Sequence, residues 1–159
     1  MLNLKEYVAP MSAWTGIVRY AQDHSNLLGG QLPTVYSEDE LLKVMKKEAK
    51  NVLYPKEYDT FRKALTSLYK GKAVSIKKEN IFRLFFVLGL GSDTEAQDLL
   101  MNYLHQSELS ARSLDDFIII AALKLRLSWE QACSIRSSYG EQIAAQPTAP
   151  SQITEGQTA

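Results

Sequence analysis

The chain has 159 residues, of which 45% are hydrophobic and 23% charged, a composition typical of a single globular domain with a real core. No apolar run approaches the roughly 20 residues that cross a bilayer, and MLNLKEYVAP at the N-terminus lacks the pattern of a signal peptide. The net charge is zero but unevenly spread: residues 41–83 carry +8, residues 1–40 carry −3 and residues 84–159 carry −5.

The first predicted helix covers residues 12–24, and its apolar positions fall at helical spacing on one face. These positions are Trp14, Ile17, Val18 and Ala21. The stretch 25–36, SNLLGGQLPTVY, then breaks the pattern with Gly29, Gly30 and Pro33. It is either a loop or a linker, so we treat 1–36 as an N-terminal helix and linker.

The next two predicted helices follow Ser37 and Pro55. Ser37-Glu-Asp-Glu40 fits a capping box, in which a serine hydroxyl and a glutamate satisfy each other's backbone amides. Proline is tolerated in a first turn, and Gly71 is well placed to end the helix that Pro55 begins. Both helices have an apolar face, with these inward positions: Leu41, Leu42, Met45, Ala49, Val52, Tyr58, Phe61, Leu65 and Leu68.

Four more helices are predicted in residues 75–140. A helix of about 76–88, capped by Ser75, is apolar on most sides and therefore central. Helices at 93–105, 114–126 and 129–140 follow the capping serines Ser92, Ser113 and Ser128. The run Phe-Ile-Ile-Ile at 117–120 has strand propensity, but the cap before it favours a buried helix. Residues 141–159 are polar and proline-broken, which predicts a disordered tail.

The fold class is therefore all-α: a compact helical bundle over 37–140 with a disordered C-terminal tail. No arrangement of side chains predicts catalysis, a cofactor or a metal. His24 and His105 stand far apart without ligands at metal-binding spacing, and Cys133 is best explained as a structural thiol. The pair Asp115-Asp116 is explained by the first turn of a helix, where the dipole favours acids. A single cysteine also favours a reducing cytoplasm.

One stretch resembles a known family. Residues 60–91, TFRKALTSLYKGKAVSIKKENIFRLFFVLGLG, resemble the later part of lambda-repressor-like (Xre-type) helix-turn-helix domains. Residues 60–70 match the recognition helix, Lys70-Gly71-Lys72 the basic turn, 75–90 the fourth helix and 92–104 the fifth. The resemblance extends over about 38–105. The core is divergent, because EAKNVLYPKEYD at 48–59 lacks the family's glycine turn.

The resemblance implies a DNA-binding protein, a transcriptional regulator of a bacterium or mobile element, acting through the basic 41–83 segment. Recognition helices of this family lie in the major groove of double-stranded DNA and often work as dimers. Residues 93–140 offer a dimer interface. The expected DNA contacts are Arg62, Lys63, Thr66, Ser67, Lys70, Lys72, Lys77 and Lys78.

Two alternatives stay open. Each lysine in the basic segment is also compatible with a solvated helix surface, above all Lys43, Lys46, Lys47 and Lys50. The missing glycine turn and the acidic C-terminal half instead favour a non-enzymatic helical adaptor or inhibitor. That protein would use a repressor-like core to bind a protein partner.

Overall fold

The computed structural model describes the backbone of residues 12–145 and the side chains of residues 12–139. This part of the chain is helical without strands, which confirms the predicted all-α class. Within residues 12–145 there are seven α-helices, a 3-10 turn, η2, between α2 and α3, and a π-helical segment, η3, between α6 and α7. In chain order they are α2 (Ala13–Asp23), η2 (Leu28–Gly30), α3 (Glu38–Val52), α4 (Pro55–Tyr69), α5 (Lys78–Leu88), α6 (Asp93–Asp98), η3 (Leu99–Tyr103), α7 (Leu114–Lys124) and α8 (Trp129–Ala145).

Serine caps begin most of the helices as predicted. The hydroxyls of Ser37, Ser92, Ser113 and Ser128 each accept a hydrogen bond from the amide three residues later. The predicted cap at Ser75 is wrong. Residues 75–77 are not helical, Lys77 is the N-cap with an extended backbone, and α5 begins only at Lys78.

The ends of two other predicted helices need correction. The expected continuous helix at 93–105 is α6 followed by η3, because the backbone switches to i→i+5 bonds such as that from the Leu104 amide to the Leu99 carbonyl. The last helix does not end at 140 but continues to Ala145, so the first residues of the predicted tail are helical. Residues 146–159, the rest of that tail, lie outside the described residues.

Helix α2 packs against the rest of the molecule and does not stand apart. It contacts α4 and η3, and its apolar face belongs to the same core as α3, α4 and α5. Residues 25–36 are a loop that contributes the buried side chains of Leu27 and Leu28 to that core. Gly16 allows the close approach of α2 to η3, since a Cβ there would lie 2.1 Å from the carbonyl oxygen of Tyr103.

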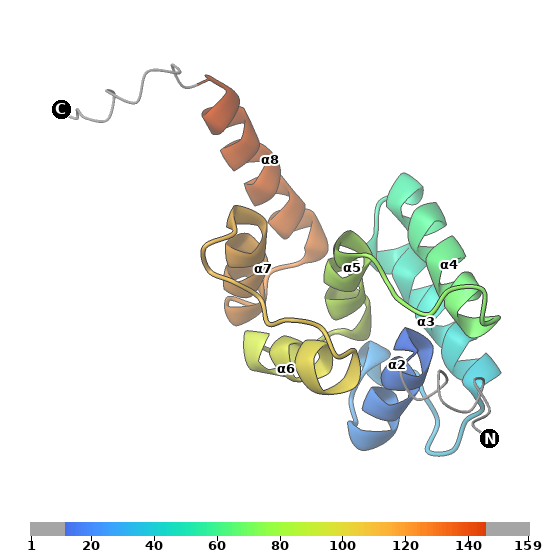
Figure 1. The fold of residues 1–159 in the computed structure, drawn as a ribbon. Coiled ribbons are helices and arrows are strands. Elements are labelled where there is room, and N and C mark those ends of the chain that lie inside the picture. The colour runs from blue at the N-terminus through green and yellow to red at the C-terminus, as the bar shows by residue number, and fades with distance from the viewer. Residues whose placement is uncertain (1–11, 146–159) are drawn as a thin grey trace.

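Helix α5 lies at the centre of the fold, as its apolar sequence predicts. Phe82, Leu84, Phe85 and Val87 are at most 2% exposed. In Figure 1, α5 separates α2, α3 and α4 on one side from α7 and α8 on the other. Helices α3 and α4 pack along each other as a hairpin with a connection of only residues 53–54, and α7 and α8 form a second packed pair.

A candidate nucleic-acid interface

Helix α4 separates a buried apolar face from an exposed charged one. Phe61 and Leu65 are fully buried, and Leu68 is 3% exposed. The opposite face carries Lys56, Lys63 and, just after the helix, Lys70, which recur at a spacing of seven residues and therefore share one side of the helix. The sequence thus places a line of ammonium groups along the outer side of α4.

The turn after α4 is fixed by backbone hydrogen bonds. The Gly71 amide donates to the Leu68 carbonyl, and the amides of Lys72 and Ala73 both donate to the Ser67 carbonyl. Gly71 has a φ of +75°, a left-handed conformation that glycine adopts without a Cβ penalty. Farther along, the Val74 carbonyl accepts from the Ala13 amide at 2.8 Å, which ties the turn to α2.

Three of the predicted DNA contacts are exposed in the connection from α4 to α5, two of them at this turn and the third at the N-cap of α5. Lys70, Lys72 and Lys77 are exposed, and within residues 12–139 none of them has an ion-pair partner. The last turn of a helix favours cations through its dipole, so the position of Lys70 is favourable for the helix as well. The structure therefore brings three unpaired ammonium groups to one ordered segment.

Arg62 and Lys63 are paired within α4. Both contact the carboxylate of Asp59, at 2.5 Å from the Arg62 guanidinium and 3.0 Å from the Lys63 ammonium. The hydrogen bond from Arg62 is the main reason that the pKa of Asp59 lies below its ordinary value. All three side chains remain open to solvent, and one carboxylate offsets one of the two cations. Arg62 and Lys63 together thus keep one net positive charge.

The other three predicted contacts are less available. The Lys78 ammonium lies 2.7 Å from Asp116, a carboxylate on α7 whose side chain is 2% exposed. Thr66 donates its hydroxyl to the Arg62 carbonyl within α4, and Ser67 is half-buried. Counting the six cations of the predicted site against Asp59 and Asp116, the surface keeps a net charge of +4. Lys78 marks the boundary of this surface with the acidic C-terminal half of the chain.

Several cations of the basic segment lie outside this surface. Lys43 pairs with Asp39 at 3.2 Å on α3, while Lys47 and Lys50 are exposed on the same helix. Arg83 is one of the basic residues counted in 41–83, but its side chain is largely buried, at 13% exposure. The local positive charge is thus smaller than the charge count of residues 41–83 indicates.

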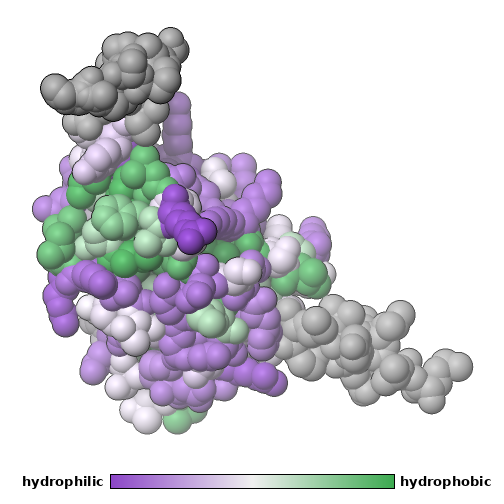
Figure 2. Space-filling view, turned by 60° about the vertical axis from the view of Figure 1, so that its left-hand side comes forward, coloured by the Kyte–Doolittle hydropathy of each residue, from purple (hydrophilic) through white to green (hydrophobic). Residues whose placement is uncertain are grey.

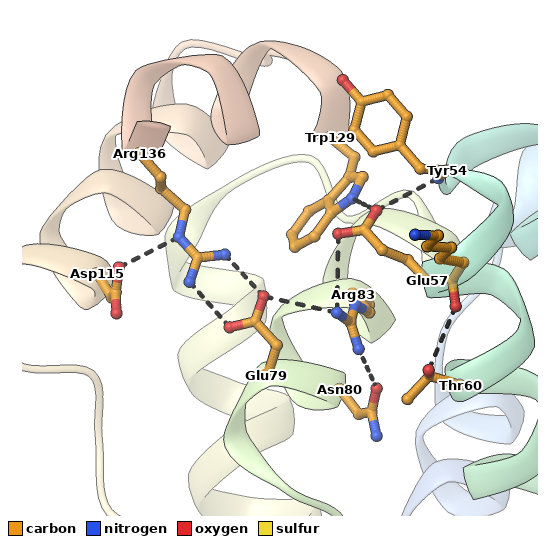
Figure 3. A network of polar contacts seen from close by, with 10 residues as sticks. Tyr54, Glu57, Thr60, Glu79, Asn80, Arg83, Asp115, Trp129 and Arg136 are labelled. Carbon is orange, nitrogen blue, oxygen red and sulfur yellow. Dashed lines mark hydrogen bonds and ion pairs between the residues drawn. The ribbon is translucent and has the colours of Figure 1, made fainter. Parts of the chain in front are cut away.

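Arg83 belongs to a polar network between α4, α5, α7 and α8 (Figure 3). Arg136 on α8 binds both carboxylate oxygens of Glu79, at 2.8 and 2.9 Å, and donates to Asp115 at 3.2 Å. Arg83 donates to Asn80 at 2.7 Å and lies 3.7 Å from Glu57. These contacts attach the α7–α8 pair to the centre of the molecule.

The same network changes the pKa values of Glu79 and Arg136. The hydrogen bonds from Arg136 hold the pKa of Glu79 below its ordinary value, and in return they raise the pKa of the Arg136 guanidinium. Sequence reasoning missed this cluster. Glu79 and Arg83 are four residues apart on a predicted helix, which is a signal for that local pair, but the partner Arg136 lies 57 residues away from Glu79.

His24, Tyr103 and Cys133, which lie outside the basic surface, make contacts that stabilise the fold. His24 stacks on Tyr20 with ring centroids 3.9 Å apart, and its Nδ1 meets the Tyr20 carbonyl. Tyr103 donates to Asp23 at 2.7 Å, which raises the pKa of Tyr103 to about 12. Burial raises the pKa of the Cys133 thiol to about 11, so the reactive thiolate is rare at neutral pH. Among residues 12–139, no three or more His, Cys, Asp and Glu side chains come together in a way that could hold a metal ion.

Helix α7 is the helix whose exposure to solvent differs most from the prediction. The sequence predicts a buried helix, and five of its residues are buried, yet its other side is open to solvent. Phe117 is 50% exposed and Leu114 is 39% exposed, while Leu125, just after the helix, is 69% exposed. Figure 2, which brings the α7 side of the molecule forward, shows hydrophobic residues gathered in one area with hydrophilic residues around it.

Comparisons with protein-family models, curated proteins and solved structures give no match for this chain. None of the helices in the described part is both long and apolar enough to cross a membrane.

Proposed function

We propose that this protein binds double-stranded DNA through the basic surface of α4 and the turn that follows it, as a non-enzymatic regulator in the cytoplasm of a bacterium or in a mobile element. The observation that carries the proposal is the group of Lys70, Lys72 and Lys77. These side chains are exposed and have no acid partner among residues 12–139. Lys70 and Lys72 sit on a turn that backbone hydrogen bonds fix, and Lys77 is the N-cap of α5 at the other end of the α4–α5 connection.

Phosphate contacts account for most of this binding. Ammonium groups on a fixed turn neutralise phosphates without the entropy loss of ordering a flexible loop. Each neutralised phosphate releases condensed counterions. Lys63 extends the line of charge along α4, and Arg62 lies beside it. When DNA approaches, phosphates compete with Asp59 for both cations. Thr66 supplies a hydroxyl near them.

The acidic C-terminal half of the chain does not cancel this surface. Asp116 is bound to Lys78 and Asp115 to Arg136, so the two acids in the first turn of α7 are each compensated inside the protein. Lys78 then orients α7 relative to the basic surface and is not itself a principal DNA contact.

Fluorescence anisotropy with a mixed-sequence DNA duplex at several salt concentrations tests the proposal. Counterion release gives log affinity a slope of roughly −0.9 against log salt for each phosphate neutralised. Replacing Lys70, Lys72 and Lys77 with glutamine should flatten that slope by about 2.7 if each contacts one phosphate. The matched control replaces Lys43, Lys47 and Lys50 on α3, which removes the same charge from another surface.

The proposal fails if the wild-type protein does not bind at low salt, or if the α3 control loses as much affinity as the turn variant. An equal loss would mean that only the total charge matters. Circular dichroism of both triple variants establishes that they remain folded, since all six side chains are on the surface.

A protein-binding adaptor is the second candidate function, and the α3–α4 hairpin favours it. The helices of a DNA-reading helix-turn-helix are joined by a turn of three to four residues that often contains glycine, whereas α3 and α4 are joined by residues 53–54 without a glycine. If the adaptor reading is correct, the protein purifies from its host with a stoichiometric protein partner and no nucleic acid, and the anisotropy titration is flat.

A further inference from the structure

The outer side of α7 is an apolar helix face that no other described element covers. Its stripe follows helical spacing and consists of Leu114, Phe117, Ala121 and Leu125. The residues on the opposite side of α7, including Ile119 and Ala122, are fully buried in the molecule. Helix α7 therefore buries one side within its own chain and presents a second apolar side to solvent, bordered by Ile120 and Lys124.

We propose that this face pairs with the same face of a second copy of the chain, with the two α7 helices antiparallel. A two-fold axis between positions 119 and 120 sets Leu114 against the partner's Leu125. The same axis sets Phe117 within one residue of the partner's Ala121. Each large aromatic side chain then meets the smallest residue of the stripe, and the contact occurs twice, as an isologous interface requires.

Charge favours the antiparallel arrangement over the parallel one. Asp115, which stays 57% exposed although it contacts Arg136, lies in the first turn of α7 and Lys124 in the last, so antiparallel helices align opposite charges and opposite helix dipoles. Lys124 borders the exposed stripe, and it then lies level with the first turn of the partner helix. In a parallel pair the two lysines would meet, and so would the two Phe117 rings.

The size of the face sets the strength of the pairing. The exposed parts of the stripe amount to roughly 300 Å² per copy, within the range of the largest apolar patch on a monomer. Two copies would bury about 600 Å² along α7, less than the 1,200–2,000 Å² of a stable interface. We expect a weak dimer that dissociates on dilution.

Sedimentation velocity on the full chain, from roughly 1 µM to 1 mM, measures this equilibrium. Wild-type protein should shift from monomer to dimer across the range, and Phe117→Glu should stay monomeric at the highest concentration. Val35→Glu is the matched control, because Val35 is an apolar side chain that is 85% exposed in the loop before α3. It should dimerise like wild type, and thermal melts at low concentration should show both variants folded.

Cysteine pairing tests the orientation. In a Cys133→Ser background, Phe117→Cys and Ala121→Cys proteins are oxidised mildly, separately and mixed. The antiparallel pair predicts most cross-linked dimer in the mixture, because position 117 of one copy lies within one residue of position 121 of the other. A protein that is monomeric at every concentration overturns the proposal, and so does stronger cross-linking of Phe117→Cys alone than of the mixture. Neither result depends on whether the protein binds DNA.

Discussion

Helices α4 and α7 use apolar residues in opposite ways. In α4 the apolar side chains lie on one side and are buried, while the other side is charged and solvated. In α7 apolar residues surround the helix, and one side of it remains exposed. The difference teaches that α4 buries its apolar side within its own chain and presents charge to solvent, whereas α7 leaves part of its apolar surface exposed to solvent.

The largest expected effect compares one phenylalanine from each helix. Phe61 on α4 is fully buried and Phe117 on α7 is 50% exposed. Phe61→Ala should lower the free energy of unfolding by about 3–5 kcal/mol through lost burial and a cavity. Phe117→Ala should change it by less than about 0.5 kcal/mol in the monomer. Urea unfolding at low protein concentration measures both, and equal losses would remove the distinction between the two helices.

A smaller effect is expected where the α7–α8 pair joins the rest of the molecule. Arg136→Ala removes two charge-assisted bonds to Glu79 and one to Asp115, and should cost about 2 kcal/mol. The control is Arg112→Ala, because Arg112 is an exposed arginine in the loop before α7. It should be near neutral. If Arg136→Ala is also neutral, packing alone holds α8 in place.

The smallest expected effect depends on pH. Because the pKa of Glu79 is lowered in the folded protein, its stabilisation is present above the ordinary value of 4.5 and is lost as pH falls through the folded value. Glu79→Gln should cost roughly 0.5–1 kcal/mol at pH 7, reduced by solvent screening because the carboxylate is 42% exposed. Unfolding curves of wild type and variant should converge below pH 4.5; a constant difference would contradict this assignment.

The helices were predictable where local signals agree. Ser37, Ser92, Ser113 and Ser128 mark real helix starts, because a serine hydroxyl and a nearby amide need only a few residues to meet. The predicted cap at Ser75 failed because serine before an apolar run indicates only a possible start; residues 75–77 stay outside the helix, and Ile76 among them is buried in the core at 6% exposure. The switch to π geometry in η3 has no local signal of this kind.

The candidate sites were predictable only in part. Exposed lysines near a glycine turn can be found in the sequence, and Lys70, Lys72 and Lys77 are exposed as expected. Whether a charge is free or paired depends on the tertiary fold, so Lys78 with Asp116 and Arg136 with Glu79 could not be foreseen. Nor does an apolar helix reveal which of its sides the rest of the chain covers, which is why α7 was expected to be buried.

The two tryptophans give the protein a built-in pair of optical reporters. The indole of Trp14 on α2 donates to Glu38 at 2.6 Å, and that of Trp129 at the start of α8 donates to Glu57 at 2.7 Å. Both acceptors belong to the α3–α4 hairpin. Replacing either tryptophan with phenylalanine leaves one fluorophore, which reports the detachment of α2 or of α8 from that hairpin. Coincident fluorescence transitions from the two variants would make the hairpin the hub of a single cooperative unit.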